Sequence, residues 1–188
     1  DHGLDEALER LEPWRQRLGK RPGAFDAGAA SVHLMASDTA GHVAALERAL
    51  AADAGSPWRR VEATLAQARF GDAGRADQLL GPLTDARLPR HADAPLQWAR
   101  GLVQLRLQQR DALATLGAAV DTLCALRERP AAWIHLACCV CDHAVPLAQA
   151  GLYELARERI GAVWPVLQVH APRSLLRLLE AESLLPAP

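Results

Sequence analysis

The amino-acid sequence predicts an all-α protein, and three observations lead to that fold class. Alanine (38 residues) and leucine (31 residues), both strong helix formers, make up more than a third of the 188-residue chain. Residues that favour strands are scarce, with two isoleucines, five threonines and one tyrosine. Glycine, proline and aspartate recur at intervals typical of helix ends. An all-β or an α/β fold is therefore not expected.

The glycine, proline and aspartate residues divide the chain into ten expected helices. In chain order they span 4–18, 24–37, 39–53, 57–70, 73–86, 95–108, 110–128, 131–149, 151–169 and 173–185. Ser56, Asp72 and Asp93 are predicted as N-cap residues, because a short polar side chain can accept a hydrogen bond from a free backbone N–H of the first turn.

Three prolines lie inside the expected helices rather than at their starts. Pro13, Pro146 and Pro165 each stand among apolar residues at helical spacing. A proline in a helix interior removes one backbone hydrogen bond and clashes with the preceding turn. We therefore expect these three helices to kink or break.

Charge, hydropathy and cysteine usage exclude several classes of protein. The 21 basic and 22 acidic side chains are interspersed without a cluster of like charges, so nucleic acid is not expected as a partner. No apolar run approaches the roughly 18 residues of a membrane-spanning helix, so no membrane is expected either. The four cysteines do not resemble a secreted disulfide framework, because three of them fall within one expected helix. We therefore predict a cytoplasmic protein.

Two segments share one spacing of glycine, alanine and apolar residues. They are Gly71, Ala76, Leu80 and Leu83 in the first, and Gly151, Ala156, Ile160 and Val163 in the second. This is the second-helix pattern of a tetratricopeptide repeat, whose alanine lets the two helices of a pair approach closely. The segment from Trp98 to Leu105 is similar to the first-helix pattern W-x2-L-G-x2-Y, with Leu and Gly exchanged and Leu105 for the tyrosine.

On these motifs the chain resembles the tetratricopeptide-repeat superfamily over about residues 39–170. The candidate close-approach alanines are unevenly spaced, at Ala45, Ala76, Ala114 and Ala156. Long, irregular pairs of this kind also resemble the helical-repeat region of large bacterial regulators of the maltose-activator-like LuxR type. An unrelated helical bundle is the alternative.

The resemblance implies an all-α, right-handed solenoid of antiparallel helix pairs. It implies one continuous domain at 39–188, which ends in a capping helix, and irregular N-terminal helices at 1–38. A solenoid has a concave groove lined by first helices. The repeat alignment at Ala114 and Ala156 places six residues there: Leu96, Ala99, Val103, Arg106, Cys138 and Cys141.

From this groove we predict a non-catalytic module that binds a protein or peptide partner and no cofactor, within a bacterial transcription regulator. The alternative is a small-molecule, metal or redox sensor. It would use four residues at i, i+3, i+4 and i+7 on one helix face, namely His135, Cys138, Cys139 and Asp142. One straight helix cannot surround an ion with four ligands, so we predict no metal site.

Catalysis would need a nucleophile beside a base. Cys139 stands at helical spacing from His135 and from His143. It lies in the middle of an expected helix, however, without the helix N-terminus that lowers a cysteine pKa. The chain also lacks the common catalytic motifs, so we predict no enzymatic activity.

The remaining distinctive residues are expected to serve packing or to lie at the surface. Trp58, Trp98 and Trp133 stand near first-helix starts and are predicted to pack between repeats. The leucine-rich segment 173–185 is predicted to cap the last repeat or to form a homodimer contact. Five histidines are expected in surface or loop positions: His2, His33, His42, His91 and His170.

Overall fold

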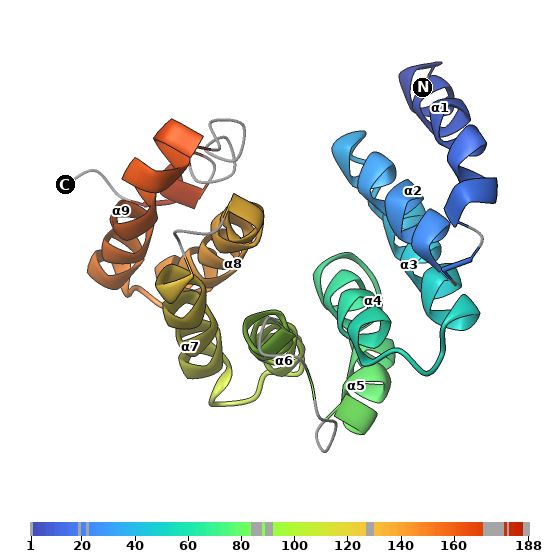
Figure 1. The fold of residues 1–188 in the computed structure, drawn as a ribbon. Coiled ribbons are helices and arrows are strands. Elements are labelled where there is room, and N and C mark those ends of the chain that lie inside the picture. Colours follow the sequence, from blue (N-terminus) through green and yellow to red (C-terminus); the bar gives the residue numbers. More distant parts are fainter. Residues whose placement is uncertain are drawn as a thin grey trace. The chain divides into compact units, whose positions relative to one another are not determined.

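The computed structural model describes residues 2–18, 20–21, 23–83, 88, 92–126, 130–170, 179 and 181–185, with the side chains of 2, 16, 130–134, 166–167 and 169–170 outside the description. Within these residues every regular element is a helix, which confirms the all-α prediction (Figure 1). The elements are α1 (His2–Leu18), α2 (Ala24–Met35), α3 (Thr39–Ala52), α4 (Pro57–Phe70), α5 (Ala73–Leu80) with a 3₁₀ turn (Gly81–Leu83), α6 (Asp93–Arg106), α7 (Ala112–Ala125), α8 (Pro130–Gln149) and α9 (Tyr153–His170).

The helix boundaries follow the glycine, proline and aspartate signals closely. The helices α2, α3, α4 and α5 begin at the predicted positions 24, 39, 57 and 73. The turn between α6 and α7 is longer than expected, because Gln108 adopts a positive φ of 56° and α7 begins only at Ala112. The tenth expected helix, 173–185, lies mostly outside the described residues.

Two of the three predicted N-caps are confirmed. The Ser56 side chain accepts a hydrogen bond from the Arg59 backbone N–H at 3.3 Å, and Asp72 accepts one from Arg75 at 2.6 Å. The prediction for Asp93 is wrong, because α6 already includes Asp93 as its first residue. A cap that was not predicted is Asp38, which accepts a hydrogen bond from the Gly41 backbone N–H at 2.9 Å and so starts α3.

The expected breaks at internal prolines do not occur. Pro13, Pro146 and Pro165 lie within the continuous helices α1, α8 and α9. An internal proline costs a helix about 3 kcal/mol. In α8 this cost is offset by packing, since Ala144 and Leu147 on either side of Pro146 are both buried.

The chain divides into two compact units, 1–92 and 93–188. Within the first unit, α2 packs on α3 and α4 packs on α5, and these pairs share a core with α3 against α4. That core consists of Ala30, Ala45, Leu46, Leu50, Ala63, Ala66 and Leu79. Because α2 and α3 contribute to the same core, the expected division at residue 38 does not correspond to a change in packing.

In the second unit, α6 packs on α7 and α8 packs on α9, and α7 also contacts α8. Trp98, Leu116, Leu136 and Val163 from the four helices are fully buried there. Gly101 allows the close approach of α6 to α7. A Cβ at Gly101 would lie 2.8 Å from the Leu116 Cγ and 3.0 Å from the Leu116 backbone nitrogen. Consecutive helices joined by such short turns run antiparallel.

The alanines proposed for close helix approach separate into two groups. Ala45, Ala76 and Ala156 are fully buried, as expected for residues at helix crossings. Ala114 is exposed, so the alignment at that position is wrong. The buried residues of α7 with the same spacing begin two residues earlier, at Ala112. Two residues correspond to about 200° around a helix, which moves a side chain to the opposite face.

Candidate functional site

The six residues predicted to line a groove do not form an open surface. Ala99, Val103 and Cys141 are buried, with exposed fractions of 0%, 1% and 9%. Leu96 and Cys138 are half-buried, and of the six only Arg106 is exposed. For the four residues of α6 the error follows from the alignment at Ala114, which places the wrong face of α6 toward the expected groove. Cys138 and Cys141 were placed by the alignment at Ala156 instead. Ala99 and Val103 serve the core of the second unit instead.

The polar residues of the cysteine-rich helix α8 serve packing. Trp98 in α6 donates a hydrogen bond from its Nε1 to the Asp142 Oδ2 at 3.0 Å, and its ring meets the edge of the His135 ring at 6.2 Å between centroids. In the part of the chain that the structure describes, no three His, Cys, Asp or Glu side chains are placed to hold a metal ion. The alternative metal site at His135, Cys138, Cys139 and Asp142 is therefore not assembled.

Further along α8, His143 lies in a polar cluster between three helices. It is 2% exposed, and its ring packs against Gly117 of α7 and near Arg159 of α9, which pairs with Asp121 of α7. Burial, aided by the positive charge of Arg159, lowers the pKa of His143 to about 4, although Asp121 opposes this. Its Nδ1 has no hydrogen-bond partner among the described residues.

The candidate nucleophile Cys139 and its candidate base His143 are both buried. Cys139 is fully buried, and His143 is buried beside it on the same helix. None of the four cysteines forms a disulfide bond, and Cys124 and Cys138 are the two that are half-buried. A substrate therefore has no access to Cys139 in this conformation.

Two histidines flank the turn between α2 and α3, with His33 near the end of α2 and His42 near the start of α3. His33 and His42 were expected at the surface, but both are partly buried. His33 Nδ1 lies 2.7 Å from the Asp38 Oδ2, and His42 Nδ1 donates to the Ala30 carbonyl at 2.8 Å. The backbone hydrogen bond from Gly41, followed by His33, lowers the pKa of Asp38. Desolvation is the main cause that lowers the pKa of His42. Each histidine thus links α2 to the start of α3 through a hydrogen bond.

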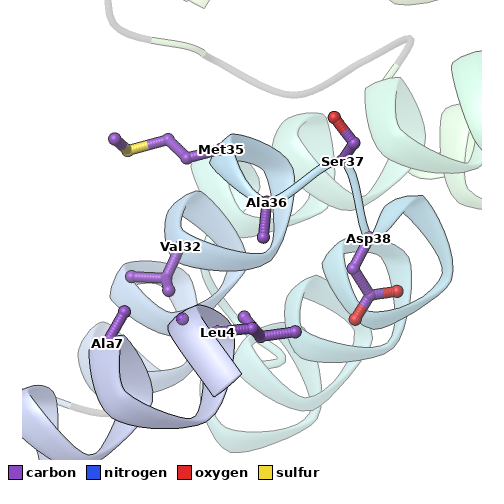
Figure 2. A pocket seen from close by; sticks show the side chains of 8 residues that line it. Leu4, Ala7, Val32, Met35, Ala36, Ser37 and Asp38 are labelled. Atoms are coloured by element: carbon purple, nitrogen blue, oxygen red, sulfur yellow. The ribbon is translucent and has the colours of Figure 1, made fainter. Parts of the chain in front are cut away.

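Two clefts lie on either side of α1 in the first unit. One, of about 870 Å³, is lined by Leu4 and Ala7 of α1 and by Val32, Met35 and Asp38. Figure 2 shows Ala7 and Val32 facing each other across this cleft, with Met35 extending away from the helices. Met35 is 80% exposed, the largest exposure among the described large apolar side chains.

The second cleft, of about 790 Å³, lies on the other side of α1 and is lined by more charged residues. Asp5, Leu8 and Glu12 of α1 line it, opposite Phe25 and His33 of α2. Arg48 of α3 also lines it and pairs with Asp26 at 3.0 Å. The guanidinium of Arg15 stacks over the Phe25 ring at 3.9 Å from its centroid, a cation–π contact that joins α1 to α2.

A third, smaller pocket of about 340 Å³ lies beside α9. Ile160 and Trp164 of α9 line it together with Glu182 and Leu185. Ala181 is buried, so the described end of the chain packs on α9. The predicted cap at 173–185 stays a prediction, because most of that segment lies outside the described residues. The packing role predicted for Trp98 is confirmed by its burial, whereas the Trp133 side chain is not described.

Comparison with protein-family models, with curated proteins and with solved structures finds no match to this chain. A search of the described helices for one long and apolar enough to cross a membrane also finds none. The clefts beside α1 and the side-chain clusters of α8 are therefore the features from which a function is inferred.

Proposed function

We propose that the protein is a non-catalytic, tetratricopeptide-like helical-repeat module that binds a protein or peptide partner. Its support is the recurrence of antiparallel helix pairs, α2 with α3, α4 with α5, α6 with α7 and α8 with α9. The buried alanines Ala45, Ala76 and Ala156 fit the close approach that such pairs require. We extend the proposal to a cytoplasmic bacterial regulator as the parent protein, on the sequence resemblance alone.

The observation that carries the binding function is the pair of clefts beside α1. They combine exposed apolar side chains, above all Met35, with charged residues at the rim, such as Asp5 and Arg48. An apolar centre with a polar rim, rich in methionine and arginine, is typical of protein interfaces. Methionine also adapts its shape to different partners. Clefts of this volume between helices suit a polypeptide segment.

The sensor and enzyme alternatives have less support. The thiol that would act as a nucleophile or redox sensor, Cys139, is fully buried, and so is the neighbouring His143. The polar side chain of Asp142 is engaged by Trp98. Cys139, Asp142 and His143 each pack within the second unit, and this packing accounts for them without a ligand site.

The proposal is tested with a display library of peptides of about 20 residues, the length of a helix that spans roughly 30 Å. Selected peptides should slow amide hydrogen exchange in α2 and should lose binding to the Met35→Glu variant. Leu152→Glu is the matched control, since Leu152 is also an exposed apolar residue but lies in the second unit. Selected peptides that protect only other helices, or a library that yields no binder, would contradict the proposed site.

A further inference from the structure

The helix α1 is seated on the rest of the first unit with little apolar burial among its described side chains. None of its described side chains is buried, whereas α2 contributes Ala29 and Ala30 and α3 contributes Ala45 and Leu46 to the interior. The two clefts run along both of its sides, so α1 meets α2 along a narrow contact. Apolar burial is the main source of helix docking energy, and α1 has little of it.

Helix α1 is packed loosely, whereas the start of α2 is packed firmly on α3. Gly23, immediately before α2, is buried and has a φ of +70°. A Cβ at Gly23 would lie 2.3 Å from the Ala49 carbonyl oxygen, so its backbone packs directly on α3. The start of α2 is therefore fixed to α3, and a movement of α1 would take place on the N-terminal side of Gly23.

The face of α2 beneath α1 is an apolar stripe. Phe25, Ala29, Val32 and Met35 lie at i, i+4, i+7 and i+10, which places them on one side of the helix. All four line one or the other of the two clefts. Such a stripe is the groove that an amphipathic helix uses for docking, through residues at i, i+3, i+4 and i+7.

The charges of the second cleft indicate the kind of helix that fits the stripe. Asp5, Glu9 and Glu12 of α1 line the same cleft as His33 and Arg48. One basic residue of α1, Arg15, also lines it and pairs with Glu12, so the flank of α1 is acidic in balance. The apolar residues Leu4, Ala7, Leu8 and Leu11 of α1 follow helical spacing next to this acidic flank. The helix that already occupies the site therefore combines an apolar stripe with an acidic flank, and its chemistry describes the competitor.

We propose that α1 is a displaceable cover and that an amphipathic helix with an acidic flank, from a partner protein, binds α2 in its place. This inference rests on the proposed function, because it assigns a partner class and a regulation to the same clefts. Intramolecular α1 competes with the partner at the high effective concentration of a tethered segment. Only the fraction of molecules with α1 displaced binds the partner, so the closed state reduces the apparent affinity.

The test uses the full chain and a fluorescently labelled synthetic peptide of residues 2–18 as the probe helix. Leu8→Glu places a negative charge in the cleft beside Asp5 and Glu12 and should release α1. This variant should bind the probe about tenfold or more tightly than the unmodified chain, because it removes the intramolecular competitor. Ala7→Glu, which acts from the other cleft, is a second opening variant.

Two controls locate the probe on the proposed face. Val32→Glu, combined with Leu8→Glu, should abolish probe binding, since Val32 lies at the centre of the apolar stripe. Leu152→Glu should leave the affinity unchanged. Amide hydrogen exchange should show α1 opening more readily than α2 and α3, and the probe should speed exchange in α1 while it slows exchange in α2.

Results that contradict the displacement of α1 differ from those that contradict the proposed binding function. Equal probe affinity in the unmodified chain and in both opening variants would overturn the displacement of α1. Library peptides that protect α2 without faster exchange in α1 would also overturn it, yet would leave the proposed function intact. A dimer that forms by exchange of α1 between two copies, detected by analytical ultracentrifugation, would overturn the choice of a partner protein's helix as the occupant.

Discussion

The indole Nε1 of Trp98 donates a hydrogen bond of 3.0 Å to the Oδ2 of Asp142, and this bond joins α6 to α8 within the second unit. Trp98 is the largest of the fully buried side chains in the described part of the chain. A buried indole N–H needs an acceptor, because an unsatisfied donor away from water is costly. Asp142, which the sequence suggested as an alternative metal ligand, supplies that acceptor.

Replacement of Asp142 by alanine should therefore destabilise the protein. We expect a loss of about 1–3 kcal/mol, because the variant removes this acceptor from a buried N–H. Chemical denaturation followed by circular dichroism measures the loss. Glu154→Ala is the control, since Glu154 is exposed in its pair with Arg157 and exposed pairs contribute about 0–1 kcal/mol. Equal denaturation midpoints for the two variants would contradict the structural role of Asp142.

The buried His143 should make stability depend on pH. Its pKa is about 4 in the folded protein and about 6.5 when unfolded, so the unfolded state binds the proton more readily. Stability is then fully present above pH 6.5 and decreases as the pH falls toward 4. Between pH 7 and pH 5 the loss should be about 2 kcal/mol.

The variant His143→Phe isolates this contribution, because it keeps a ring of similar size and cannot titrate. Its free energy of unfolding should fall less between pH 7 and pH 5 than that of the unmodified chain. A smaller dependence should remain, since the pKa of His42 is lowered as well. If the two proteins lose the same free energy over this interval, His143 is not buried in its neutral form.

Gly101 and Gly161 provide a matched pair of glycine substitutions within helices. Gly101→Ala should destabilise the second unit by about 1–3 kcal/mol, because its Cβ would lie 2.8 Å from Leu116 and force α6 away from α7. At Gly161, a Cβ meets nothing within 4 Å, so alanine should stabilise α9 by up to about 1 kcal/mol through its higher helix propensity. Thermal melting of both variants measures the opposite signs. A stabilising shift in both would show that the α6–α7 contact is wider than described, and a destabilising shift in both would contradict the open space at Gly161.

Alanine-to-leucine substitutions distinguish the buried candidate alanines from the exposed one. Ala76→Leu and Ala156→Leu should each cost about 1–3 kcal/mol by overpacking a helix pair. Ala114→Leu should change stability by less than about 0.5 kcal/mol, because Ala114 is exposed. Denaturant midpoints test the three variants together. A cost at Ala114 equal to that at Ala76 would restore the original repeat alignment.

The sequence allowed the helices to be predicted well because their ends depend on local chemistry. Ser56 and Asp72 each cap the helix that follows them, and a cap is decided within one turn of backbone. At Pro13, Pro146 and Pro165 the sequence predicted a kink or a break, and the helices do not break. Beside Pro146 the buried Ala144 and Leu147 supply packing that offsets the local cost of proline, and such packing is not visible in the local sequence.

The candidate site could be predicted far less well, because a helix face is set by a register that local signals do not define. The choice of Ala114 in place of Ala112 turned the predicted groove toward the core. His33 and Asp38 do carry a local signal, since they stand five residues apart across a helix end. The clefts beside α1 have no such signal, because they arise from the way in which Leu4 and Leu8 meet a separate helix.

The last prediction concerns the order in which the four thiols react. The three cysteines of α8 differ in exposure, since Cys138 is half-buried, Cys141 is buried and Cys139 is fully buried. Buried structural cysteines react only when the surrounding structure opens. Cys138 and Cys124 should therefore be labelled first in the folded protein, Cys141 later, and Cys139 only after unfolding.

Timed labelling with an alkylating reagent, followed by fragmentation of the labelled peptides in a mass spectrometer, resolves the neighbouring cysteines. The Cys139→Ala variant is the control, because it should leave the rate at Cys138 unchanged if the two sites open independently. Addition of denaturant should speed labelling at Cys139 far more than at Cys138, since only Cys139 requires the opening of α8. Labelling of Cys139 as fast as Cys138 in the folded protein would show an accessible thiol beside His135 and His143, and would restore the redox or catalytic alternative.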